Sequence, residues 1–77
     1  MQAVLYTNGN QESDRLVSLM SSLGLAYREY QLDCHFTDEQ FKAEFGKNAD
    51  YPQAFMNCRH LGNMSAIMRY LKSIEMI

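Results

Sequence analysis

The chain has 77 residues, a mass of 8.9 kDa and a formal net charge of −2. A chain this short buries only about 60% of its surface on folding, so residues 1–77 are expected to form a single domain. The hydrophobic fraction of 47% indicates a folded globule rather than a disordered chain. The acidic balance, without any basic block, argues against nucleic acid as a partner. The uninterrupted apolar runs are too short to span a membrane, and the chain opens on no leader-like segment.

The two cysteines, Cys34 and Cys58, lie far apart in the sequence. A secreted chain of this size would normally carry several disulfides, so two distant thiols indicate a reducing compartment, and we expect a cytoplasmic protein. A zinc site would have to combine these thiols with His35 and His60. These side chains do not cluster on one turn, and no metal site is expected.

The first strand and the first helix are predicted before residue 25. Residues 3–7 form a short apolar run rich in β-favouring residues, which is typical of a central strand covered on both faces. Residues 13–23 carry apolar side chains at positions i, i+3, i+4 and i+7, which predicts an amphipathic helix. Ser13 is the expected N-cap of this helix and Gly24 its terminator.

A second strand and a second helix follow. Residues 25–32 interleave Tyr and Leu with polar residues, which predicts a strand at a sheet edge. Thr37 and Gln40 have the spacing of a capping box, with Thr37 as the N-cap of the second helix. Phe36 and Phe41 stand where a hydrophobic staple places its two apolar partners.

The third and fourth strands are short. Gly46 ends the second helix, and Pro52 marks the start of the next strand because proline cannot occupy the interior of a central strand. Residues 53–56 form that strand. Residues 57–59 have the length of a tight hairpin, and residues 60–61 make a very short fourth strand.

The last segment predicts a third helix, with either Asn63 or Ser65 as its cap. Its apolar face consists of Ile67, Tyr70, Leu71 and Ile74. The predicted order is therefore β-α-β-α-β-β-α. A β-α-β unit implies parallel strands and the short hairpin an antiparallel pair, so we expect a four-stranded mixed sheet with helices on its faces.

This order, with a proline opening the third strand and a glycine before the last helix, resembles the thioredoxin fold in its smallest form. Residues 52–62, PQAFMNCRHLG, are similar to the glutaredoxin stretch P-Q-x-F-[IV]-[DN]-G-x-x-[IL]-G-G. Residues 36–41 are similar to the matching helix start of small glutaredoxins, including those encoded by large tailed phages. Residues 5–7 match the end of their first strand. The resemblance covers essentially the whole chain and implies a thioredoxin-like (glutaredoxin) α/β fold.

The resemblance fails at the position that carries the chemistry. Glutaredoxins have C-x-x-C, or a single-cysteine variant, at the start of the first helix. Alignment on that helix puts the two cysteine positions at Asn10 and Ser13, whereas counting without a gap from the first strand puts them at Gln11 and Asp14. Neither register contains a cysteine. Asparagine and serine cannot form a disulfide, so dithiol exchange of the family type is excluded at this position.

Either Cys34 or Cys58 would have to substitute for the missing pair, and the resemblance favours Cys34 by its position. In the resembled fold, the hairpin at Cys58 lies at the pole opposite the usual active site, and Cys34 lies at the active-site pole but to one side. Their Cα atoms are expected to lie beyond the limit of about 7 Å for a disulfide. We interpret both as ordinary turn and loop thiols, with Cys34 as a redox-active or glutathionylated thiol as the alternative.

The resemblance also implies a partly preserved groove for glutathione. In glutaredoxins the residue before the proline pairs its backbone with the cysteinyl part of glutathione, and that X-Pro bond is cis; Tyr51 and Pro52 match these positions. The start of the third helix binds the γ-glutamyl carboxylate through backbone N–H groups. The matching residues here are Gly62, Asn63 and Ser65.

The charges around this groove differ from those of the family. Asn8 replaces the basic residue after the first strand, and Asp50 adds a negative charge beside the proline. Lys47 is a candidate replacement cation. Carboxylate recognition is therefore expected to be weakened, so no cofactor is predicted, with glutathione kept as a weak ligand.

Together these features predict a glutaredoxin-like domain without active-site cysteines. It would be redox-inactive and would bind a protein partner or a glutathione-like thiol peptide. The alternative is a thiol–disulfide oxidoreductase, a glutaredoxin-type electron donor, that uses Cys34. Kinship with such donors also suggests a ribonucleotide-reductase-type partner.

Overall fold

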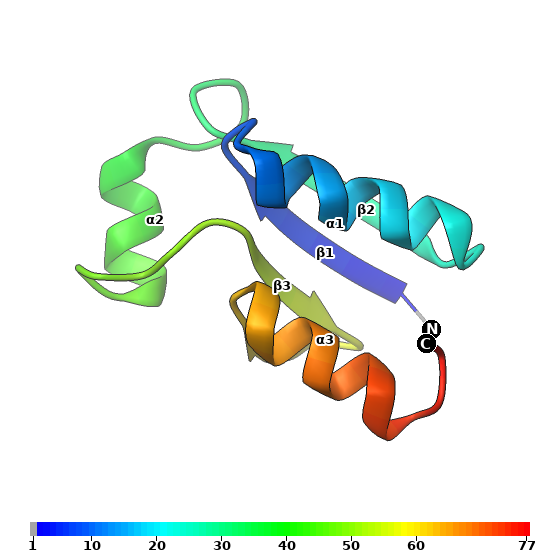
Figure 1. Ribbon diagram of the computed structural model, residues 1–77. Coiled ribbons are helices and arrows are strands. Elements are labelled where there is room, and N and C mark those ends of the chain that lie inside the picture. Colours follow the sequence, from blue (N-terminus) through cyan, green and yellow to red (C-terminus); the bar gives the residue numbers. More distant parts are fainter. Residues whose placement is uncertain (1) are drawn as a thin grey trace.

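The computed structural model describes residues 2–77, and within them four strands and three helices follow the predicted order (Figure 1). The elements are β1 (Gln2–Thr7), α1 (Gln11–Ser22), β2 (Ala26–Gln31), α2 (Asp38–Phe45), β3 (Gln53–Met56), β4 (Arg59–Gly62) and α3 (Met64–Ser73). The strands form one mixed sheet in the order β2-β1-β3-β4. β1 runs parallel to β2 and antiparallel to β3, and β3 runs antiparallel to β4. The edge position predicted for the second strand is confirmed.

The hairpin between β3 and β4 is shorter than predicted. It has two residues, Asn57 and Cys58, with φ angles of 52° and 69°. Positive φ at both central residues is the geometry of a type I′ turn, whose twist matches that of the flanking strands. Arg59 therefore belongs to β4, where it pairs with Met56.

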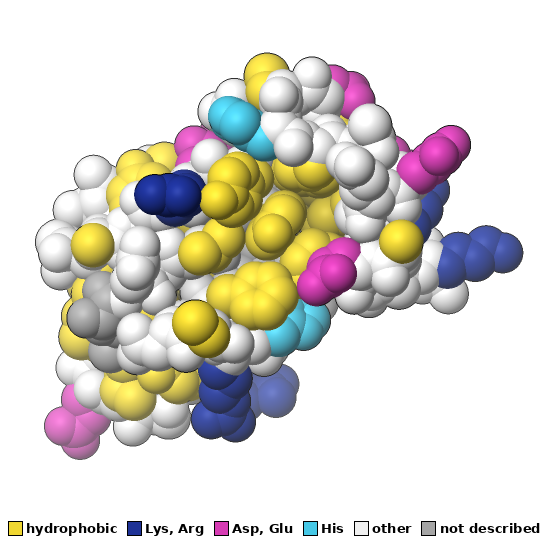
Figure 2. All heavy atoms as spheres, turned by 180° about the vertical axis from the view of Figure 1, so that it is seen from behind, with side chains coloured by type: hydrophobic (Ala, Val, Ile, Leu, Met, Phe, Trp, Pro, Cys, Tyr) yellow, Lys and Arg dark blue, Asp and Glu magenta, His cyan; other side chains and the backbone are white. Residues whose placement is uncertain are grey.

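The two faces of the sheet are covered unequally. α1 and α3 both lie on one face, whereas the other face shows a broad apolar surface (Figures 1 and 2). On that second face, Val4, Tyr6 and Phe55 are only half-buried. The prediction that both faces of the first strand are covered is therefore wrong for this face. The reason is the length of α2, whose eight residues span about 12 Å and pack their Phe45 ring against Tyr6 and Phe55.

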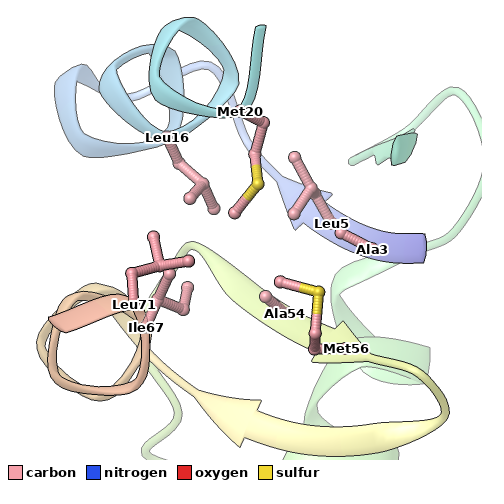
Figure 3. Packing of buried hydrophobic residues seen from close by; sticks show 8 residues of the cluster. All are labelled: Ala3, Leu5, Leu16, Met20, Ala54, Met56, Ile67 and Leu71. Carbon is pink, nitrogen blue, oxygen red and sulfur yellow. The ribbon is translucent and has the colours of Figure 1, made fainter. Parts of the chain in front are cut away.

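The core fills the space between the sheet and the two long helices (Figure 3). Alternate residues of β1 point into it, as the two-residue period of a strand requires. Its fully buried members are Ala3, Leu5, Leu16, Met20, Ala54, Met56, Ile67 and Leu71. Burial of each large side chain contributes about 1.5–3 kcal/mol, so this one-sided cluster is the main source of stability.

The first helix begins three residues earlier than predicted. Asn10, not Ser13, is the N-cap, and its side-chain oxygen accepts a hydrogen bond of 2.7 Å from the backbone N–H of Ser13. Asparagine caps a helix as well as serine does, and the earlier start adds a polar first turn. The predicted end is confirmed, since Gly24 has a φ of 69° and donates its N–H to the Ser21 carbonyl, as in a Schellman motif.

The third helix begins at one of its two predicted caps. The side chain of Asn63 accepts a hydrogen bond of 3.3 Å from the N–H of Ala66, so Asn63 is the N-cap. Ile67 and Leu71 are buried as predicted, but Ile74 is not part of the buried face. It caps the end of the helix and is 37% exposed, because the chain turns there.

The capping box of α2 is expected to stabilise the fold. The Gln40 N–H donates to Thr37 Oγ1 at 3.2 Å, and the Thr37 N–H donates to Gln40 Oε1 at 2.9 Å. Thr37→Ala is expected to lower the free energy of unfolding by about 1 kcal/mol, because one helix N–H loses its acceptor. Urea unfolding measures the change. Ser65→Ala, at an exposed position that caps nothing, should change stability by less than about 0.5 kcal/mol; equal losses would contradict the assignment.

Candidate functional site

The start of α1 lies beside the proline that precedes β3. Tyr6 pairs with Gln53 in the antiparallel register of β1 and β3, so one further step along both strands brings Thr7 next to Pro52. Pro52 is buried, and the Tyr51–Pro52 peptide bond is cis, as the resemblance implies. The loop that enters α1 and the turn before β3 are therefore neighbours at one end of the sheet.

Amide and hydroxyl groups occupy the start of α1. Asn10 is exposed and caps the helix, while Ser13 is only 1% exposed. The Ser13 hydroxyl donates to Asn8 Oδ1 at 3.4 Å and accepts from the Asn8 N–H at 3.4 Å. A carboxamide does not remove a proton from an alcohol at neutral pH, so Ser13 has no base that would make it a nucleophile. In the other alignment register, Gln11 and Asp14 are both exposed on the first turn.

At the start of α3, one of the backbone N–H groups that could bind an anion is already hydrogen-bonded within the chain. The Asn63 side chain accepts the N–H of Ala66 at 3.3 Å, so one of the unpaired N–H groups at this helix end is occupied. Gly62 has a φ of 120°, and a Cβ atom there would lie 3.1 Å from the Cβ of Ala66. Glycine is therefore required for the close approach of β4 to α3.

A groove between α1 and α3 contains one of the predicted site residues, Ser65. It has a volume of about 430 Å³ and is lined by Glu12, Met64, Ser65, Met68, Arg69 and Lys72. Sequence reasoning missed the two cations, although Ser65, Arg69 and Lys72 have the i, i+4, i+7 spacing of one helix face. Lys47, the predicted cation, lies exposed on the loop after α2 and does not line this groove.

α2 holds the side chain of Tyr51. The Tyr51 ring stacks on Phe41 with a centroid distance of 3.9 Å, and its hydroxyl donates to Asp38 Oδ1 at 3.4 Å. Burial, followed by the charge and hydrogen bond of Asp38 and by the charge of Asp33, raises the pKa of Tyr51 to about 12. Within residues 2–77 the Tyr51 backbone makes no backbone–backbone hydrogen bond outside the regular elements. Its side chain is thus fixed while its main chain is available.

The raised pKa of Tyr51 predicts a loss of stability in alkali. A tyrosine whose pKa is higher in the folded than in the unfolded chain stabilises the fold below pH 10, and this contribution is lost as the pH rises towards 12. Asp38→Asn should lower the pKa of Tyr51 towards 10, because it removes the nearest negative charge. Titration of phenolate absorbance, with Tyr51→Phe to identify the signal, measures this. Asp50→Asn, which alters a carboxylate outside the causes of the shift, should leave the midpoint unchanged; equal shifts in both variants would refute this origin.

The two thiols lie at opposite ends of the sheet. Cys34 and Cys58 are both exposed and unpaired within residues 2–77. Cys34 donates its N–H to the Gln31 carbonyl beyond the end of β2, whereas Asn57, next to Cys58, donates to the Gln2 carbonyl at the start of β1. The length of β1, about 16 Å at 3.3 Å per residue, separates these ends, so the thiols cannot form a disulfide with each other.

The histidines have structural partners. His35 Nδ1 accepts the N–H of Gln31 at 2.9 Å, and His60 Nε2 lies 2.8 Å from Gln53 Oε1. In the part of the chain that the structure describes, no group of three or more His, Cys, Asp or Glu side chains could hold a metal ion. No helix among these residues is long and apolar enough to cross a membrane.

Comparison with solved structures shows a likeness to glutaredoxins over nearly the whole chain. Glutaredoxin 1 from Francisella tularensis, in a crystal structure with cacodylate, superposes with a TM-score of 0.78 at 18% sequence identity, over 96% of this chain and 95% of that one. The reduced glutaredoxin of Escherichia coli superposes with a TM-score of 0.67 at 17% identity, over 95% of each chain. No protein-family model and no curated protein sequence matches the chain. The element order, the mixed sheet and these superpositions agree that the chain has the thioredoxin-like fold of the glutaredoxins.

Proposed function

We propose that this domain acts by binding, without thiol–disulfide exchange of its own. The observation that carries the proposal is the start of α1, where Asn10 caps the helix and Ser13 is buried against Asn8. An exchange enzyme of this fold needs a thiolate stabilised by the positive end of that helix. Here that end is satisfied by a carboxamide oxygen, and the first turn carries Glu12 and Asp14, which disfavour an anion.

The proposed ligand is an extended segment of a protein partner or a glutathione-like thiol peptide, bound beside Tyr51. Backbone pairing with an extended ligand needs no cysteine from the domain. In the described chain, Tyr51 makes no backbone–backbone hydrogen bond outside the regular elements, so its main chain can take part in such pairing. Arg69 and Lys72, on the α3 side of the groove with Ser65, supply positive charge for a ligand carboxylate. A ribonucleotide-reductase-type protein is one partner that the resemblance suggests, and the cytoplasmic location is likewise part of the proposal.

Titration with reduced glutathione tests the small-ligand form of the proposal. Millimolar glutathione should shift the amide NMR signals of Tyr51, Gly62 and Ser65 with a common binding curve. Lys72→Gln should weaken binding by about twofold to fivefold, because it removes one exposed charge from the groove. Lys47→Gln is the matched control and should have no effect. If these three amides do not move at millimolar ligand, glutathione is not the ligand, and capture of partners from the native host then tests the protein-partner form.

Cys34 supports one alternative. It is exposed at the end of the sheet where β1 and β2 terminate, since the neighbouring Leu32 donates its N–H to the Thr7 carbonyl at 2.9 Å. This is also the end where α1 begins. The alternative function is therefore thiol–disulfide exchange through Cys34, and the substitution Cys34→Ser separates it from binding alone.

A further inference from the structure

The open face of the sheet carries a continuous cluster of aromatic rings. Tyr6 is its centre, with ring-centroid distances of 5.4 Å to Tyr30, 5.3 Å to Phe36 and 5.0 Å to Phe45. Phe45 in turn contacts Phe55 on β3 at 5.8 Å. Figure 2 shows this face as an apolar expanse bordered by isolated charged side chains. It is the face that α1 and α3 leave open, so it is separate from the groove proposed above.

A pocket lies between this cluster and α2. Its volume is about 420 Å³, and it is lined by Tyr6, Tyr30, His35, Phe36, Gln40, Phe41, Glu44 and Phe45. Glu44 is the one carboxylate among these described lining residues, and no Lys or Arg is among them. The His35 ring is held by a backbone hydrogen bond, since its Nδ1 accepts the N–H of Gln31 at 2.9 Å. The pocket therefore combines aromatic faces with a single negative charge.

The charge of Glu44 acts on the aromatic centre of the pocket. Burial raises the pKa of the Tyr6 phenol, with smaller contributions from Tyr30 and Glu44. Because Glu44 and Tyr6 line the same pocket, a bound group can contact both of them. Aromatic rings attract cations through the negative potential of their faces, and a carboxylate beside them strengthens that attraction. This chemistry suits an ammonium or guanidinium group and repels an anion.

A second groove continues from this pocket along the sheet. It has a volume of about 630 Å³ and is lined by Gln2, Val4, Tyr6, Tyr30, Phe55, Asn57 and Cys58. Tyr6 and Tyr30 line both cavities, so the pocket and the groove adjoin at these two residues, and together they are called the channel. Its far part carries the apolar side chains of Val4 and Phe55 with the uncharged Gln2 and Asn57 at its rim, and no Asp, Glu, Lys, Arg or His is among its described lining residues. A free small cation would fill only the end at Glu44 and leave the apolar part uncovered.

We infer that this channel binds a protein segment with one basic side chain followed by apolar ones. The Lys or Arg side chain lies between Glu44 and the Tyr6 ring, and the apolar side chains cover Val4 and Phe55. The argument for this occupant is complementarity of charge at one end and of apolar surface along the rest. The inference goes beyond the proposed function, because it concerns the open face of the sheet and uses neither the main chain of Tyr51 nor the groove between α1 and α3, although the Tyr51 ring stacks on Phe41 of the pocket wall.

Peptide titrations followed by amide NMR test the inference. The probes are an acetylated and amidated tetrapeptide with the sequence Arg-Leu-Val-Leu, the same peptide with Glu in place of Arg, and acetyl-arginine amide. The Arg peptide should shift the amides of Tyr6, Glu44 and Phe55, and bind at least threefold more tightly than both other probes. Glu44→Gln should weaken the Arg peptide by about threefold to tenfold. Glu39→Gln, the same change at an exposed position of α2 outside the pocket, should leave binding unchanged.

Each other result overturns the inference. Equal binding of the Arg and Glu peptides would show that charge plays no part. Acetyl-arginine amide binding as tightly as the Arg peptide would make this a site for small cations. Absence of shifts with millimolar Arg peptide, or equal weakening by both glutamate substitutions, would also refute it. Both glutamates are exposed, so loss of folding does not confound the comparison.

Discussion

Replacing Asn10 and Ser13 with cysteine is expected to give this chain thiol–disulfide exchange activity. Asn10 is exposed at the N-cap of α1, and Ser13 is buried three residues further on. In the double variant, the cysteine at position 10 is therefore the accessible, attacking thiol, and the cysteine at position 13 is the buried, resolving thiol. The positive end of the helix lowers the pKa of a thiol at the N-cap, and Glu12 and Asp14 in the first turn oppose this effect only in part. A pKa lowered from 8.5 to 7.5 raises the thiolate fraction at pH 7 from about 3% to about 25%.

The experiment uses a background in which both native thiols are replaced, Cys34→Ser/Cys58→Ser. Adding Asn10→Cys/Ser13→Cys should raise glutathione-dependent reduction of a mixed disulfide on the order of tenfold above that background. Gln11→Cys/Asp14→Cys is the control for the other alignment register and should stay near background. Activity in the control alone would show that the register is wrong. A folded N10C/S13C protein without activity would show that the scaffold itself no longer supports the chemistry.

The largest loss of stability is expected from substitution of Leu5 in β1. Its neighbour Val4, on the opposite face of the same strand, provides the matched control. Leu5 is 0% exposed in the core, so Leu5→Ala should lower the free energy of unfolding by about 3 kcal/mol. Val4 lies on the open face and is half-buried, so Val4→Ala should cost less than about 1 kcal/mol. For a domain of this size, whose total stability is about 4–12 kcal/mol, the first loss is severe.

Urea unfolding of both variants measures this difference. The comparison is matched, since both substitutions shorten an aliphatic side chain on the same central strand. Equal losses would mean that the second face of the sheet is covered in solution, either by another arrangement of α2 or by a second copy of the chain. Concentration dependence of the unfolding midpoint distinguishes these two cases.

Local signals predicted most of the fold. Thr37 and Gln40 satisfy each other's backbone groups within four residues, so the start of α2 depends on no distant contact. The start of α1 was harder to predict, because Asn10 and Ser13 are both good caps and lie one turn apart. The packing of Ser13 against Asn8 decides between them, and that contact depends on the loop after β1.

The open face could not be predicted from the pattern of β1. Every residue from Ala3 to Tyr6 is apolar, which is equally compatible with cover on one face and on both. Burial of the second face depends on how far α2 extends over the sheet, and this depends on tertiary packing rather than on the local sequence of β1. Similarly, the cations of the groove required the packing of α3 beside α1, which brings Arg69 and Lys72 close to Glu12.

The structure gives the surroundings of the site positions taken from the resemblance, whereas their roles stay predictions. The cis bond between Tyr51 and Pro52 is present, and Ser65 lines a groove. Lys47, exposed on the loop after α2, does not line that groove, and its role as a cation for the ligand stays a prediction. The roles of Gly62 and Asn63 in ligand binding stay predictions, and the side-chain oxygen of Asn63 accepts a hydrogen bond from the first turn of α3.

The central claim is that the native chain does not catalyse thiol–disulfide exchange. Its most direct test is the rate of glutathione-dependent reduction of a mixed disulfide by the wild-type protein, beside Cys34→Ser and, as a matched control, Cys58→Ser. The account predicts that all three rates equal the rate without protein. A wild-type rate clearly above that background, lost in Cys34→Ser and kept in Cys58→Ser, would contradict it and identify Cys34 as the reactive thiol.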